Sequence, residues 1–130
     1  MKITELRIGN LVLDEDGCYM YIGAIKGNSK SDTVEDSAGN EVKVSSLNSI
    51  SLDWEMLEKQ GFKPARPNSG VLLLPIAFED SDYPCTLQLS GSGLCVARSG
   101  VGAITAPVFY LHQLQNLYYA LTGQELEVKL

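Results

Sequence analysis

The first 50 residues alternate apolar and polar positions in short runs that are separated by turn-forming residues. This period of two is typical of antiparallel strands. The intervening segments are rich in Gly, Asn, Asp and Ser, which favour tight turns. The segment therefore predicts either a small antiparallel β barrel or an open sheet. The predicted strands cover 11–13, 19–25, 33–36 and 41–44.

The period changes after residue 50. Asp53 is placed to cap a short helix over 54–60, and Gly61 supplies a residue that tolerates the left-handed conformation at its end. Trp54 stands at the start of this helix, where an indole is expected to pack over the edge of a core.

Three apolar runs follow, and they predict a three-stranded antiparallel sheet over 71–78, 85–89 and 94–97. Pro75 lacks the backbone N–H that a central strand needs, so it predicts an edge position or a bulge.

The last element is an amphipathic helix that starts at Thr105 or Ala106, has Pro107 in its first turn and ends at Thr122-Gly123. Its apolar stripe is expected to cover the sheet. The stripe consists of Leu111, Leu114, Leu117, Tyr118 and Leu121. The fold class is therefore α+β, with a small β module over 1–50 and a module of helix, sheet and C-terminal helix over 51–130; one continuous domain is the alternative.

The opposite face of the C-terminal helix carries the best candidate for a binding surface. His112, Gln115, Asn116 and Tyr119 recur at helical spacing, so four hydrogen-bonding side chains are expected to project in one direction. The simpler interpretation is a solvated helix face, because polar residues occupy whichever side does not face the core.

No catalytic, cofactor or metal site is predicted. His112 is the only histidine, and no spacing brings Cys85 or Cys95 to it as a nucleophile. The cysteines form no C-x-x-C pair, and neither glycine-rich stretch has the spacing of a phosphate-binding loop. The sequence thus predicts a protein that is not an enzyme.

The formal net charge of −6 argues against a broad surface for duplex nucleic acid or for an anionic membrane. A local basic patch on the loop from Lys26 to Lys30 is kept as an alternative. The sequence shows neither a signal-peptide pattern nor a run long enough for a transmembrane helix, so a cytoplasmic location and no membrane partner are expected.

Three stretches carry a resemblance: Leu6-Arg-Ile-Gly-Asn-Leu-Val12, residues 50–62, and the closing segment 111–126 with its His112-Gln-Leu-Gln-Asn116 core. They resemble uncharacterised small proteins encoded in prophage-like and mobile regions of gut anaerobic bacteria. The resemblance implies a non-enzymatic accessory protein of a mobile element, with His112, Gln113, Gln115 and Asn116 as signature positions.

The function predicted from these observations is an interaction module that binds another protein, or a second copy of itself, through the His112 stripe or an exposed sheet edge. The alternative is a nucleic-acid-binding accessory protein that uses the N-terminal small barrel and the Lys26 to Lys30 loop.

Overall fold

The computed structural model describes residues 1–27, 31–68, 70–76, 85–91, 93–98 and 102–130, and the fold is α+β. The chain divides into two compact units. Unit 1 comprises Met1–Ser51 and Tyr110–Asn116, and unit 2 comprises Leu52–Phe109 and Leu117–Leu130. The start of the C-terminal helix belongs to unit 1. The division into modules over 1–50 and 51–130, or one continuous domain, stays a prediction.

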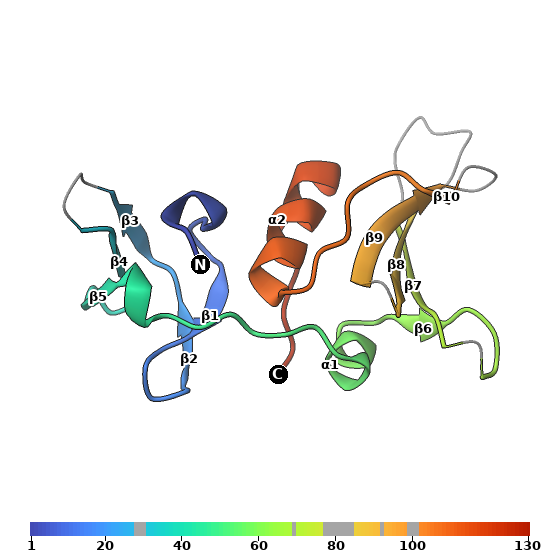
Figure 1. Ribbon diagram of the computed structural model, residues 1–130, viewed down its shortest axis with the longest axis horizontal. Coiled ribbons are helices and arrows are strands. Elements are labelled where there is room, and N and C mark those ends of the chain that lie inside the picture. The colour runs from blue at the N-terminus through green and yellow to red at the C-terminus, as the bar shows by residue number, and fades with distance from the viewer. Residues whose placement is uncertain (28–30, 69, 77–84, 92, 99–101) are drawn as a thin grey trace. The chain divides into compact units, whose positions relative to one another are not determined.

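Unit 1 contains two antiparallel sheets, one of two strands (β1–β2) and one of three (β3–β4–β5) (Figure 1). The barrel predicted as one alternative is therefore not confirmed, since the strands form no closed ladder. Two 3₁₀ helices, Ile3–Glu5 and Val44–Ser46, accompany the sheets. The strands are β1 (Leu11–Leu13), β2 (Tyr19–Tyr21), β3 (Ala24–Lys26), β4 (Thr33–Glu35) and β5 (Glu41–Lys43).

The core of unit 1 follows from the alternation of side chains along its strands. In β2, Met20 is buried while Tyr19 and Tyr21 on either side of it are exposed. The apolar residues that share the core with Met20 come from both sheets and from the segments beside them. They are Leu6, Val12, Ile22, Val34, Val44 and Leu47.

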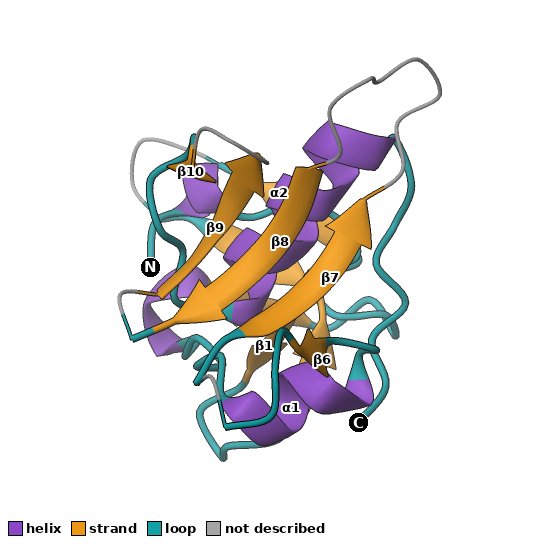
Figure 2. Ribbon diagram, turned by 90° about the vertical axis from the view of Figure 1, so that its right-hand side faces the viewer, coloured by secondary structure: helices purple, strands orange, loops and turns teal. Residues whose placement is uncertain are grey.

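Unit 2 holds an antiparallel sheet in the order β10-β9-β8-β7-β6, which Figure 2 shows in face view. The prediction of three strands is corrected to five, because two-residue strands extend both edges. Pro75 pairs with Thr86 of β8, and β6 pairs only with Leu72 and Leu73. No described strand therefore pairs with Pro75 on the side away from β8, although β7 lies between β8 and β6 in the sheet. The strands are β6 (Lys63–Pro64), β7 (Leu72–Ile76), β8 (Cys85–Ser90), β9 (Gly93–Arg98) and β10 (Gly102–Ala103).

Helix α1 (Trp54–Lys59) is capped as predicted, since Asp53 Oδ1 accepts a hydrogen bond from the Met56 N–H at 2.7 Å. Helix α2 (Leu111–Thr122) begins later than predicted. The segment before it pairs with β9 instead: the Val108 N–H donates to the Leu94 carbonyl at 2.7 Å. Pro107 therefore precedes a β bridge rather than a helical turn. The pairing of Val108 with Leu94, which is distant in sequence, decides the conformation of this segment.

That α2 covers the sheet stays a prediction.

Within the described part of the chain, no helix is both long and apolar enough to cross a membrane.

Candidate functional site

The polar face of α2 is not the exposed stripe that the sequence predicts. His112 and Gln115 are buried, with 0 % and 2 % of their surface exposed, and Asn116 is half-buried. Only Tyr119 is exposed, at 43 %. The expected exposure is therefore wrong for three of the four residues, and a binding role for this set stays a prediction.

The amide of Gln115 closes the outer edge of β1. Its Oε1 accepts a hydrogen bond from the buried Leu11 N–H at 2.8 Å, and its Nε2 donates to the Gly9 carbonyl at 3.1 Å. Asn116 also bonds to the backbone, in the segment before β1: its Nδ2 donates to the Glu5 carbonyl at 2.8 Å. The Leu11 N–H would otherwise be buried without a partner among the described residues, whereas Gly9 and Glu5 are half-buried.

His112 has a different environment. Neither ring nitrogen forms a hydrogen bond with a described residue, and the nearest carboxylate oxygen, Glu5 Oε2, lies 3.6 Å from Nε2. The ring stacks on Tyr110 with centroids 6.1 Å apart. Burial lowers the pKa of His112 from its usual value and outweighs the opposing effect of Glu5, so the imidazole is neutral at neutral pH.

The outer side of β2 is a strand edge of unit 1 to which no described strand pairs. The Ile22 N–H donates to the Asn10 carbonyl and the Asp14 N–H donates to the Cys18 carbonyl, each at 2.9 Å. Bonded pairs alternate with non-bonded pairs in an antiparallel ladder, so Tyr19 and Tyr21, which face β1 between these pairs, occupy non-bonded positions. Their N–H and C=O groups point away from β1, and no described residue bonds to them.

The outer side of β1 is closed by contrast. Leu13 and Asn48 exchange two backbone hydrogen bonds of 2.9 Å each, and Gln115 accepts from Leu11. The same two-stranded sheet therefore has one satisfied edge and one open edge.

A groove with a volume of about 300 Å³ runs beside the open edge. One wall is β2 with the turn that precedes it, and the other comes from β5 and the turn between β4 and β5. Tyr19 and Tyr21 line this groove and are 56 % and 44 % exposed. We call this the β2 groove; its lining residues are Asp14, Glu15, Asp16, Tyr19, Met20, Tyr21, Asp36, Ser37 and Val42.

The β2 groove is strongly acidic. Four of its lining residues are carboxylates, and no Lys or Arg is among the described residues that line it. None of the four carboxylates forms an ion pair with a described residue. The uncompensated negative charge next to two exposed tyrosines favours a cationic ligand, because cations bind both carboxylates and aromatic faces.

Two of these carboxylates are held in place by the turns they belong to. Asp36 Oδ1 accepts from the N–H groups of Ala38 and Asn40 at 2.9 and 2.8 Å, and Oδ2 accepts from Asn40 Nδ2 at 3.0 Å. The Asn40 side-chain hydrogen bond, together with the backbone N–H groups, lowers the pKa of Asp36, which keeps it ionised. Asp14 Oδ1 likewise accepts from the Asp16 N–H at 2.9 Å.

From the sequence, both groove walls are predicted as ordinary strands with their adjoining turns, and no binding site is predicted there. One local indication of the groove is present in the sequence: Tyr19 and Tyr21 are two residues apart, so their side chains lie on the same side of a strand. What the sequence does not display is that Asp36, which is distant along the chain, lines the same groove as Tyr19 and Tyr21.

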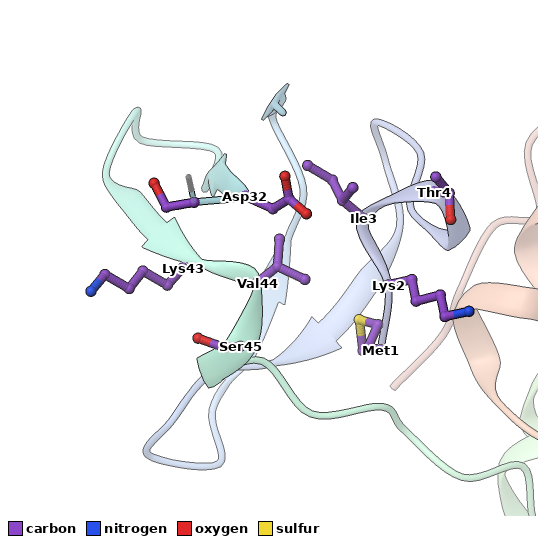
Figure 3. A pocket seen from close by; sticks show the side chains of 9 residues that line it. Met1, Lys2, Ile3, Thr4, Asp32, Lys43, Val44 and Ser45 are labelled. Carbon is purple, nitrogen blue, oxygen red and sulfur yellow. The ribbon is translucent and has the colours of Figure 1, made fainter. Parts of the chain in front are cut away.

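A larger hollow, of about 660 Å³, lies between the N-terminal segment and the β5 end of unit 1 (Figure 3). Figure 3 shows the ammonium groups of Lys2 and Lys43 directed away from one another, at opposite sides of the hollow. Because its charged groups do not converge, this hollow lacks the few oriented polar contacts that give a binding site its specificity.

The basic loop kept as an alternative is partly described. Lys26 Nζ lies 2.6 Å from Glu35 Oε1 and 3.8 Å from Glu41 Oε2, so its charge is shared with two carboxylates. Lys30 lies outside the described residues.

Within the described residues, no group of three or more His, Cys, Asp and Glu side chains is arranged to hold a metal ion. The chain matches no known protein-family model, no curated protein and no solved structure.

Proposed function

We propose that the protein is an interaction module that binds a basic, extended segment of another protein by strand addition along β2. The observation that carries the proposal is the edge of β2, where the backbone groups of Tyr19 and Tyr21 bond to no described residue and lie beside an acidic groove. In strand addition, backbone hydrogen bonds supply affinity and alternate side chains supply specificity.

The two tyrosines define what the incoming strand meets. Each offers one N–H and one C=O, which a strand pairing with β2 satisfies at alternate residues. Side chains on one side of that strand contact the rings of Tyr19 and Tyr21, and cationic ends reach the carboxylates of the groove. Cation–π contact with exposed tyrosines adds about 0.5 to 1 kcal/mol for each well-placed cation.

Charge favours a basic partner over a second copy of the same chain. Pairing β2 with β2 of another copy would bring two sets of groove carboxylates together, and like charges across an interface oppose association. Association with itself, part of the original prediction, is therefore the less favoured form of this proposal.

The accessory role in a prophage-like or mobile element, implied by the resemblance, belongs to this proposal as its biological setting. The nucleic-acid alternative has less support, because Lys26 is paired with carboxylates and the β2 groove repels phosphates.

The test uses a synthetic probe and amide hydrogen exchange followed by NMR. The probe is an acetylated and amidated peptide of alternating Lys and Val, and the controls are the Glu and Val counterpart and a Lys and Val peptide with alternate backbone amides N-methylated. We expect the amides of Tyr19 and Tyr21 to exchange rapidly in the free protein and slowly with the probe. The amide of Met20, which bonds to β1, should be protected in both states.

A pair of charge variants separates the groove from general charge attraction. Glu15→Lys with Asp16→Lys should weaken binding roughly tenfold at low salt, because two attractive charges become repulsive. The matched control reverses two exposed charges in unit 2, Glu58→Lys with Glu127→Lys, and should have little effect. The proposal fails if the N-methylated peptide binds as well as the probe, or if the Tyr19 and Tyr21 amides gain no protection.

A further inference from the structure

A second hollow, of about 340 Å³, lies in unit 2 and is lined by two exposed aromatic side chains. Trp54, at the first turn of α1, is 37 % exposed, and Phe109, just before α2, is 52 % exposed. The volume falls in the range of small-molecule sites, about 300 to 1,000 Å³. Exposed aromatic side chains that line one concave site offer ring faces to a ligand.

The wall that carries Phe109 is fixed by the backbone on both sides. The Leu52 N–H donates to the Phe109 carbonyl at 2.9 Å, and Val108 exchanges two hydrogen bonds with Leu94, of 2.7 and 3.0 Å. The ring also packs on Gly93, where an added Cβ would lie only 2.8 Å from Phe109 Cε1. The aromatic wall is therefore formed before any ligand binds, which reduces the entropy lost on binding.

The charge at this hollow is negative. Asp53 is its only charged residue among those described, and no Lys or Arg lines it. One oxygen of Asp53 accepts from the Met56 N–H, whereas the other accepts no hydrogen bond from a described residue. Helix α1 is only six residues long, so the full charge of Asp53 outweighs the partial positive charge at the helix start.

We propose that this hollow binds a small organic cation of the quaternary-ammonium type. The methyl groups of such a cation would contact the Trp54 and Phe109 rings, and its charge would be balanced by the free oxygen of Asp53. Aromatic walls with an acidic rim suit this ligand class because the cation is attracted to the ring faces and loses little hydration on entry. This site is separate from the β2 groove, and its test does not depend on the proposed partner protein.

The experiment titrates choline chloride into the full chain at constant ionic strength and follows tryptophan fluorescence. Trp54 is the only tryptophan, so the emission reports on this hollow directly. The control ligand is 3,3-dimethylbutan-1-ol, which has nearly the shape of choline without its charge. We expect a saturable change with choline and at least several-fold weaker binding of the alcohol. The indole N–H cross-peak in an NMR titration provides the second measurement.

Two conservative variants test the walls. Asp53→Asn keeps a good helix cap but removes the charge, and Phe109→Leu keeps an apolar side chain but removes the ring. Each should weaken choline binding about two- to fivefold, the effect of one exposed cation–π or charge contact. The matched control Glu127→Gln should bind as the parent does. The inference is overturned if neither measurement saturates, if the alcohol binds as well as choline, or if both wall variants bind choline unchanged.

Discussion

Replacing Gln115 by leucine tests the claim that this side chain closes the outer edge of β1. The substitution keeps the approximate size of the side chain and removes its amide. The Leu11 N–H then loses its acceptor, and the Gly9 carbonyl loses its donor. We expect a loss of stability, although leucine is the more hydrophobic residue, because a buried polar group without a partner costs more than the added apolar contact returns.

The magnitude follows from the burial of the two backbone groups. Leu11 is fully buried, so its unpaired N–H costs about 1 to 3 kcal/mol, whereas the half-buried Gly9 has access to water and adds less. The expected decrease in the free energy of unfolding is therefore about 2 kcal/mol. The control is Gln124→Leu, whose side chain is exposed, and it should change stability by less than about 0.5 kcal/mol.

The assay is urea unfolding with linear extrapolation, combined with hydrogen exchange of the Leu11 amide. A second variant, Gln115→Glu, sharpens the test. When protonated, its carboxyl both accepts from Leu11 and donates to Gly9, as the amide does; when ionised, it places a buried charge there. This variant should therefore become more stable relative to the parent as pH falls through the raised pKa of the new carboxyl. A cost below about 0.5 kcal/mol for Gln115→Leu, with unchanged exchange at Leu11, would refute the reasoning.

Three further predictions concern single residues. The lowered pKa of His112 means that the unfolded chain binds its proton more readily, so stability should fall as pH drops below about 6.5, by at most about 1.4 kcal/mol per pH unit. Urea titrations at several pH values should show this slope in the parent and not in His112→Leu; the Glu5 carboxylate and the N-terminal ammonium are the other charges acting on this ring. Gly93→Ala should lower stability by about 1 to 3 kcal/mol, because φ is +102° and the new methyl group meets Phe109. Asp53→Ala should cost about 1 kcal/mol through the lost cap and Asp53→Asn much less; equal thermal shifts for the two would contradict this.

The sequence predicted those elements whose signals are local. The alternation through Met20 and its two tyrosine neighbours placed β2, and the Asp53 cap placed the start of α1. Both depend on residues within a few positions of one another, where strand and helix periods differ clearly. The single strand predicted over 19–25 is wrong, however, because this segment divides into β2 and β3, which belong to different sheets. The later start of α2 was missed because the bridge between Val108 and Leu94 overrides the helix-start signal of Pro107, and no local pattern encodes that pairing.

The polar stripe of α2 was misread for a related reason. Polarity on one helix face normally indicates solvent, but Gln115 and Asn116 face backbone groups of β1 and of the segment before it. A strand edge that needs partners leaves no mark in the sequence, because every residue carries the same backbone donor and acceptor. His112 lies on the same face and is buried without a hydrogen-bond partner among the described residues, which polarity alone does not predict.

The two edges of the β1–β2 sheet differ, and this difference supports the proposed function. An open strand edge tends to pair with any other edge, and proteins usually cover it or place charge beside it. On β1, Asn48 and Gln115 cover the edge with hydrogen bonds. On β2, no described residue pairs with the edge, and the described charged residues that line the groove beside it are all acidic. Charge of one sign opposes pairing between identical copies and at the same time attracts a strand of the opposite sign, so the feature expected to limit aggregation also favours the basic partner that we propose.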